Sequence, residues 1–126
     1  PRFDHEYALS KLESQGYRIG CGSNSVRQSI EIMLQKSDLM KYMETVVSAQ
    51  EVSEPKPSPE MYEKIISNFN LTPQECLIIE DNENGIKAAK SSGAHVLIVK
   101  EVDEVNIENI TNKIKQIENF NFEVVL

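Results

Sequence analysis

The sequence predicts an α/β domain built on a parallel sheet with flanking helices, and three observations support this fold class. Short apolar runs alternate along the chain with helix-length amphipathic segments. Turn or capping residues separate these segments, and neither an internal repeat nor a Gly/Ser-rich linker interrupts them. The length of 126 residues is typical of one domain or part of one. We therefore expect strands and helices to alternate within a single unit.

The composition excludes several classes of protein. With 40% hydrophobic and 26% charged residues, the chain resembles soluble globular proteins rather than disordered ones. The formal net charge of -7 argues against nucleic-acid binding, and no apolar run is long enough for a membrane helix. Cys21 and Cys76 lie in apolar runs without metal-ligand spacing, which predicts buried thiols in a reducing compartment. We therefore expect a cytoplasmic protein.

The first half of the chain is predicted to contribute two strands. Periodic apolar residues indicate a helix over residues 6–15, which Gly16 ends, and a strand over residues 17–21 follows. A polar turn then leads into a helix whose apolar stripe runs through residues 26–34. A short amphipathic piece and a β-branched strand over residues 45–47 come next, ahead of a proline-rich loop.

The second half begins with a clearly marked helix. Ser58 followed by Pro59 is a cap and first-turn pair, and apolar residues keep helical spacing behind it as far as Phe69. A capping box over residues 72–75 then leads into the apolar run 76–79. Four consecutive apolar residues favour a strand covered on both faces, so we expect this run to lie inside the sheet.

Two further elements and a tail complete the chain. A helix that Gly93 ends is followed by a buried strand over residues 96–99. An apolar stripe then indicates a helix over residues 107–120. The apolar tail 122–126 is expected to pack as a strand at an edge of the sheet.

Three turns that follow predicted strands are candidate ligand sites, because parallel α/β sheets bind ligands at the carboxyl ends of their strands. Ser23 offers a hydroxyl where a helix begins, which suits an anion or a simple helix cap. Glu80 and Asp81 directly follow a buried strand, where they would hold Mg²⁺ or be solvated loop acids. Lys56 stands between two prolines and suits a phosphoryl oxygen, or is an exposed loop lysine.

In this order, the turns resemble the motifs of the haloacid dehalogenase-like hydrolase superfamily, in its subfamily of β-phosphoglucomutase-like phosphatases and phosphomutases. The run 19–25 is similar to the family's second motif and the run 56–62 to its third. The segment from Leu77 to Gly93 resembles the fourth motif, which is the most specific of the three. The resemblance implies a Rossmann-like core and a Mg²⁺-dependent enzyme that transfers phosphoryl groups of a small phosphorylated metabolite.

The resemblance also implies a role for each site residue. Ser23 would bind the transferring phosphate, with a further contact from Asn24. Lys56 would neutralise charge between the nucleophile and the phosphate. Asp81 would be a ligand of Mg²⁺, and Glu80 would support the ion directly or through water.

The family's first motif, a strand ending in Asp-x-Asp, and the family's helical cap are absent from this sequence. In the family fold that strand lies in the middle of the sheet, between the strands that lead to Ser23 and to Glu80. We expect its absence to leave two apolar edges. Residues 1–126 are therefore interpreted as the C-terminal portion of a single core domain, carrying motifs two to four of a longer enzyme. Without its nucleophile, the isolated chain is expected to be inactive.

Two other functions stay open. In the first alternative, the chain is a non-catalytic fragment or pseudoenzyme module that pairs with another chain through an open sheet edge. A phospho-acceptor receiver domain shares the parallel sheet and the acidic pocket. Receiver domains place their acid pair after the first strand, however, whereas Glu80 and Asp81 come late in this chain.

Overall fold

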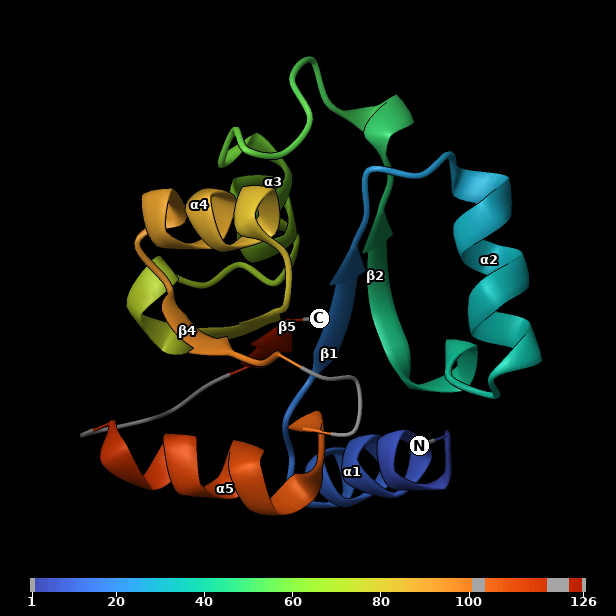
Figure 1. Ribbon diagram of the computed structural model, residues 1–126, viewed down its shortest axis with the longest axis vertical. Helices are drawn as coiled ribbons and strands as arrows, with labels where there is room; N and C mark the ends of the chain where they lie inside the picture. Colours follow the sequence, from blue (N-terminus) through green and yellow to red (C-terminus); the bar gives the residue numbers. More distant parts are fainter. Residues whose placement is uncertain (1, 101–103, 118–122, 126) are drawn as a thin grey trace.

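The computed structural model describes residues 2–100, 104–117 and 123–125, and it confirms the predicted α/β class with a parallel five-stranded sheet (Figure 1). The strands are β1 (Ile19–Gly22), β2 (Met43–Val47), β3 (Cys76–Glu80), β4 (His95–Ile98) and β5 (Glu123–Val125). The α-helices are α1 (Arg2–Ser14), α2 (Arg27–Lys36), α3 (Glu60–Asn68), α4 (Glu83–Ser92) and α5 (Ile107–Gln116). Short 3₁₀ helices are formed by η1 (Met40–Tyr42), η2 (Ala49–Glu51) and η3 (Pro73–Glu75).

Most element boundaries follow the capping signals in the sequence. Pro59 occupies the N-cap of α3, so this helix begins one residue later than predicted. Gly93 ends α4 with a φ of 87°, a left-handed conformation that glycine adopts without strain. In the predicted capping box, Glu75 Oε1 accepts hydrogen bonds from the backbone N–H and the hydroxyl of Thr72, each at 3.0 Å. Local chemistry therefore sets where these elements begin and end.

Strand β5 corrects the prediction made for the apolar tail. The tail was expected at an edge, but β5 lies in the centre of the sheet, whose strand order is β2-β1-β5-β3-β4. Val124 pairs in parallel with Ile19 of β1 and with Leu77 of β3. Strand β5 pairs with the first part of each strand that leads to Ser23 and Glu80, so residues 19–20 and 76–78 are not left as open edges toward each other. Residues 118–122 and 126, which include the predicted end of the last helix, lie outside the described residues.

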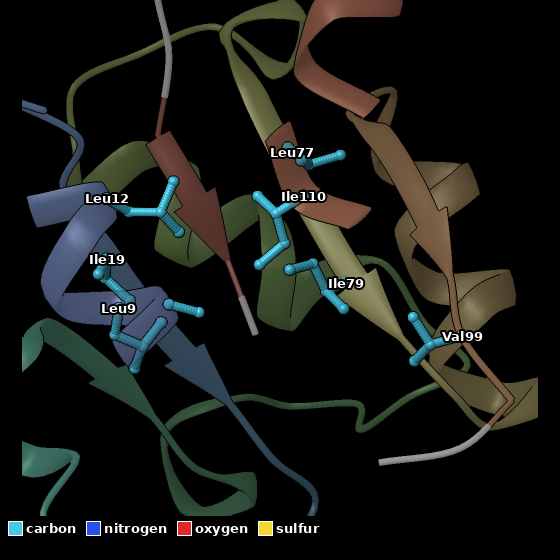
Figure 2. Close-up of a cluster of buried hydrophobic side chains, with 8 residues drawn as sticks. Leu9, Leu12, Ile19, Leu77, Ile79, Val99 and Ile110 are labelled. Carbon is cyan, nitrogen blue, oxygen red and sulfur yellow. The ribbon is translucent and has the colours of Figure 1, made fainter. Parts of the chain in front are cut away.

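The side chains of β3 alternate between the two faces of the sheet, and helices cover both faces. Leu77 and Ile79 belong to a core cluster with Leu9 of α1 and Ile110 of α5, which Figure 2 shows on one face of the sheet. Ile78 points the other way, into a cluster with residues of α3 and α4. The prediction of a strand buried on both faces is therefore confirmed. Helices α1 and α5 lie side by side below the sheet in Figure 1, and α3 and α4 lie together on the opposite side.

Both cysteines are buried, as the sequence predicted. Cys21 is 7% exposed at the end of β1, and Cys76 is fully buried at the start of β3. Burial raises the pKa of the Cys21 thiol, so this side chain stays protonated at neutral pH. Across the part of the chain that the structure describes, no helix has the length and apolar character needed to cross a bilayer.

Candidate active site

The carboxyl ends of β1 and β3 and the loop that precedes α3 border a cavity of about 520 Å³. Because the strands are parallel, the turns that follow them lie at the same edge of the sheet. The candidate residues from the sequence all line this cavity and are called the site residues below: Ser23, Asn24, Lys56, Glu80 and Asp81. The rest of the wall is largely apolar and includes Leu9, Met33, Leu34, Leu39 and Met43. The fold therefore brings together residues that lie far apart in the sequence.

Lys56 and Glu80 form a buried ion pair in the cavity wall. The Lys56 ammonium lies 2.6 Å from Glu80 Oε2, and the two side chains are only 8% and 6% exposed. Lys56 Nζ also donates a hydrogen bond to the backbone carbonyl of Gly22 at 3.0 Å. Taking a charge out of water is costly unless an opposite charge lies close by, so each partner depends on the other. Lys56 is therefore not the exposed loop lysine of the alternative interpretation.

Tyr62 joins this pair from the first turn of α3. Its hydroxyl donates to Glu80 Oε2, the same oxygen that accepts from Lys56. The Lys56 ammonium lies 4.7 Å from the centre of the Tyr62 ring, within cation–π range. Burial, together with the nearby Glu80 carboxylate, raises the pKa of Tyr62 far above its ordinary value. The phenol is therefore protonated and acts as a hydrogen-bond donor to Glu80.

The Glu80 carboxylate is held at both of its oxygens. Oε1 accepts from the backbone N–H of Asp81 at 3.1 Å and from Asn82 Nδ2 at 3.5 Å. Burial alone would raise the pKa of Glu80, but hydrogen bonds from Lys56 and Tyr62 outweigh it and hold this pKa below its ordinary value. Glu80 is thus ionised at neutral pH and fixed in one orientation.

Gly85 leaves the space that the Glu80 carboxylate fills. A Cβ atom at this position of α4 would lie 2.1 Å from the Glu80 carboxyl carbon, far inside van der Waals contact. Asn82 caps the same helix, and its side chain accepts a hydrogen bond from the Gly85 N–H at 2.7 Å. The spacing from the acid pair to the glycine therefore has a steric cause.

Asn24 fixes the loop that carries Lys56. Its Oδ1 accepts from the Lys56 backbone N–H at 3.0 Å, and its Nδ2 donates to the Lys56 carbonyl at 3.2 Å. The peptide bond between Lys56 and Pro57 is cis. The amide of Asn24 is thus bonded to the Lys56 backbone through both polar atoms, a contact that the sequence did not predict.

Ser23 lies half-buried in the turn between β1 and α2. Its backbone N–H donates to the Val47 carbonyl at 3.1 Å, and its Oγ accepts from the Ser25 N–H at 3.2 Å. Val26, not Ser23, occupies the N-cap position of α2. The alternative in which Ser23 simply caps this helix therefore does not hold, and its hydroxyl stands at the cavity wall.

Asp81 is an exposed carboxylate at the rim of the cavity. Within the described ranges, no cluster of three or more His, Cys, Asp or Glu side chains is arranged to hold a metal ion. Mg²⁺ is usually bound through one or two carboxylates together with phosphate oxygens and water. Asp81, as one exposed carboxylate at the cavity, fits that mode of binding, whereas a cage made wholly of protein ligands does not fit.

Sequence reasoning missed the polar roles of Tyr62 and Gly22. Tyr62 lies in the run 56–62 that resembles the third motif, but its spacing predicts no polar role, because a buried aromatic keeps the same spacing whether or not its hydroxyl has a partner. The available signal was its position in the helix that directly follows the Lys56 loop. The carbonyl of Gly22 carried no signal at all, since every residue has one.

Comparisons with known proteins identify the family of this chain. A profile of the haloacid dehalogenase-like hydrolases matches residues 2–99. Pyrophosphatase PpaX of Bacillus cereus is 32% identical over 91 residues, which are 72% of this chain and 42% of that protein. Phosphoglycolate phosphatase of Nitrosococcus oceani is 33% identical over 89 residues, 71% of this chain and 40% of that protein. The chain thus spans about two-fifths of the length of the curated relatives it matches.

A solved structure shows the same fold. The β-phosphoglucomutase of Clostridium difficile superimposes with a TM-score of 0.76 at 22% identity, and the match covers 90% of this chain and 56% of that one. The likeness confirms the Rossmann-like core that the motifs implied. Since the family profile matches most of the sequence, this chain belongs to the haloacid dehalogenase-like hydrolase family.

Proposed function

We propose that this chain is part of a Mg²⁺-dependent phosphatase or phosphomutase that acts on a small phosphorylated metabolite in the cytoplasm. The observation that carries the proposal is the meeting of Ser23, Lys56 and the Glu80–Asp81 pair at one cavity. A buried ammonium beside a hydroxyl suits a phosphate dianion, and an adjacent carboxylate suits its counter-cation. Relatives that are named pyrophosphatase and phosphoglycolate phosphatase support phosphoryl chemistry.

The site residues have electrostatic and positioning roles. Lys56 places its positive charge against the phosphoryl oxygens, where it stabilises the charge that develops during transfer. The Ser23 hydroxyl donates to one of these oxygens. Asp81 would hold Mg²⁺, which supplies further positive charge to the phosphate. Glu80 and Asn24 keep Lys56 in place through its ammonium and its backbone, respectively.

The phosphoryl acceptor is proposed to be an aspartate outside this sequence, in a further segment or a second chain. The phosphoryl group would leave the substrate oxygen for that carboxylate, and water or a sugar hydroxyl would then remove it. The place between β1 and β3 is taken by β5 in this structure. The acceptor segment would therefore displace β5 or enter the cavity beyond the end of β5.

Hydrolysis of an aryl phosphate with and without Mg²⁺ tests this function. We expect the 126-residue chain alone to bind inorganic phosphate weakly and to release no product. A longer protein that adds a strand ending in Asp-x-Asp is expected to turn over the same substrate only with Mg²⁺. Robust turnover by the 126 residues alone would contradict the proposal that the phosphoryl acceptor lies outside this sequence.

The substitution Asp81→Ala tests the proposed metal ligand in the longer, active enzyme. We expect it to abolish the stimulation of activity by Mg²⁺. The matched control is Glu83→Ala, because Glu83 is 84% exposed in the same segment and bonds only to Lys87 among the described ion pairs. Retention of full Mg²⁺-dependent activity by Asp81→Ala would remove Asp81 from this role.

A further inference from the structure

Tyr62 is the buried polar side chain at the site whose role the proposed function does not use. Its side chain is fully buried, and its ring packs in the cluster that α3 forms with β2, β3 and α4. Phenylalanine would fill that core equally well, so packing does not explain the hydroxyl. The hydroxyl is connected to the cavity wall through its hydrogen bond to Glu80.

The hydroxyl contacts the oxygen on which the Lys56 ammonium depends. Glu80 Oε2 accepts from both Lys56 and Tyr62, and the ammonium also lies over the Tyr62 ring. Lys56 is thus bounded by a carboxylate, an aromatic face and the Gly22 carbonyl. Because the Tyr62 hydroxyl also donates to Oε2, it engages part of the negative charge of that oxygen. Less of that charge then neutralises the Lys56 ammonium.

We propose that Tyr62 is a positioning residue of the anion site, whose hydroxyl orients the Glu80 carboxylate and so holds the Lys56 ammonium where it can bind phosphate. This inference rests on the proposed function, since it assumes that Lys56 contacts a phosphoryl oxygen. Without the hydroxyl, Lys56 would be the one side chain that donates to Glu80 Oε2 among the described hydrogen bonds, and it would meet the full negative charge of that oxygen. Less of the lysine's charge would then be available to a bound anion.

The substitution Tyr62→Phe tests the proposal in the 126-residue chain, with inorganic phosphate as the probe in isothermal titration calorimetry. Loss of one hydrogen bond to a charged group is expected to weaken phosphate binding by about tenfold or more. Thermal unfolding of the same variant is recorded alongside, because a purely structural effect would lower stability without changing affinity. The control is Tyr7→Phe, since Tyr7 is 57% exposed on α1 and is expected to keep wild-type affinity. Equal phosphate affinity in Tyr62→Phe and wild type would overturn the proposal.

A second measurement separates failure of this inference from failure of the proposed function. If the wild-type chain binds no phosphate, the proposed anion site fails, and the role of Tyr62 is decided by NMR. The backbone N–H of Asp81 donates to Glu80 Oε1, so its resonance reports the orientation of that carboxylate. We expect this resonance to move in Tyr62→Phe and to stay in place in Tyr7→Phe. An unmoved Asp81 resonance in Tyr62→Phe would overturn the positioning role.

The double substitution tests whether Tyr62 acts through Glu80. In a Glu80→Gln background, the added Tyr62→Phe change is expected to alter phosphate affinity by less than about twofold, because the two residues work as one unit. Additive losses in the double variant would mean that Tyr62 acts independently of Glu80 and would overturn the proposal.

Discussion

Two cation–carboxylate clusters in this molecule use the same chemistry in different surroundings. At the cavity, Lys56 and Glu80 lie 2.6 Å apart and are 8% and 6% exposed. Beside the outer strand β2, Arg27 and Glu51 lie 2.9 Å apart and are 40% and 27% exposed. The Arg27 guanidinium also bonds to the Val46 carbonyl at 2.6 Å, so it ties α2 to the sheet.

The difference between the clusters lies in what removal of one partner leaves behind. At the surface, water replaces a lost partner, so such pairs contribute about 1 kcal/mol or less. In the cavity wall the Lys56 and Glu80 side chains are almost fully buried, so water replaces a lost partner poorly and the unpaired charge remains buried. A buried cluster that lines a cavity, and whose loss costs much free energy, is typical of a functional site. The Arg27 cluster is explained by local structure alone.

The largest effect is expected from Lys56→Met, which breaks the buried pair. The Glu80 carboxylate would keep no counter-ion among its described partners, so we expect the free energy of unfolding to fall by about 3–5 kcal/mol. Urea unfolding at neutral pH measures this loss. Adding Glu80→Gln to the same variant removes the charge and is expected to recover part of the stability. A loss below about 1 kcal/mol for Lys56→Met alone would place the pair in the same class as surface pairs.

A smaller effect is expected from Gly85→Ala, which crowds the pair without removing a charge. The new methyl group would overlap the Glu80 carboxyl group and force it out of its present position. Overpacking of this type costs about 1–3 kcal/mol, which urea unfolding again measures. The neighbouring substitution Asn84→Ala on an exposed position of α4 serves as control and should change stability little. If Gly85→Ala is as stable as wild type, the Glu80 carboxyl group can move to another position at no cost in stability.

The dependence of stability on acidic pH gives a further test of the buried pair. The pKa of Glu80 is lower in the folded chain than its ordinary value of 4.5, so the unfolded chain binds protons more readily near that pH. Its stabilisation is therefore complete above about pH 4.5 and is lost as the pH falls through the folded pKa. We expect unfolding experiments from neutral to acidic pH to show a flatter stability profile in Glu80→Gln than in wild type. Identical slopes would contradict a depressed pKa.

The smallest effect is expected from Arg27→Met in the exposed cluster. Stability should fall by about 1 kcal/mol or less, and by less still in about 1 M salt, which screens exposed charges. The Lys56→Met loss should depend far less on salt, because buried charges are poorly screened. Urea unfolding of both variants at low and high salt makes the comparison. An Arg27→Met loss as large as that of Lys56→Met would erase the distinction between the clusters.

Local signals in the sequence predicted most elements, but not the position of β5. Capping boxes, Gly93 and the proline-rich loop mark boundaries within a few residues of where they act, so they can be recognised locally. The place of β5 depends on which strands have an unpaired side, and that is a property of the assembled sheet. A three-residue strand gives no local indication of its neighbours.

The candidate site likewise contains residues that the sequence predicted and contacts that it did not predict. Ser23, Lys56, Glu80 and Asp81 were predicted because each follows a strand or precedes a helix at the edge where ligands bind. The bonds from Asn24 to the Lys56 backbone and from Tyr62 to Glu80 were not predicted, because they join residues far apart in the sequence. Such contacts exist only once the Lys56 loop and α3 have packed against the strands.

The central position of β5 sets an order for folding during synthesis. The strand pairs β1–β2 and β3–β4 are each encoded well before β5, so each pair can form while the ribosome is still adding residues. In this structure the two pairs become one sheet only through residues 123–125. Before β5 is made, the edges of β1 and β3 that it pairs lack this partner, and unpaired strand edges are a hazard for aggregation.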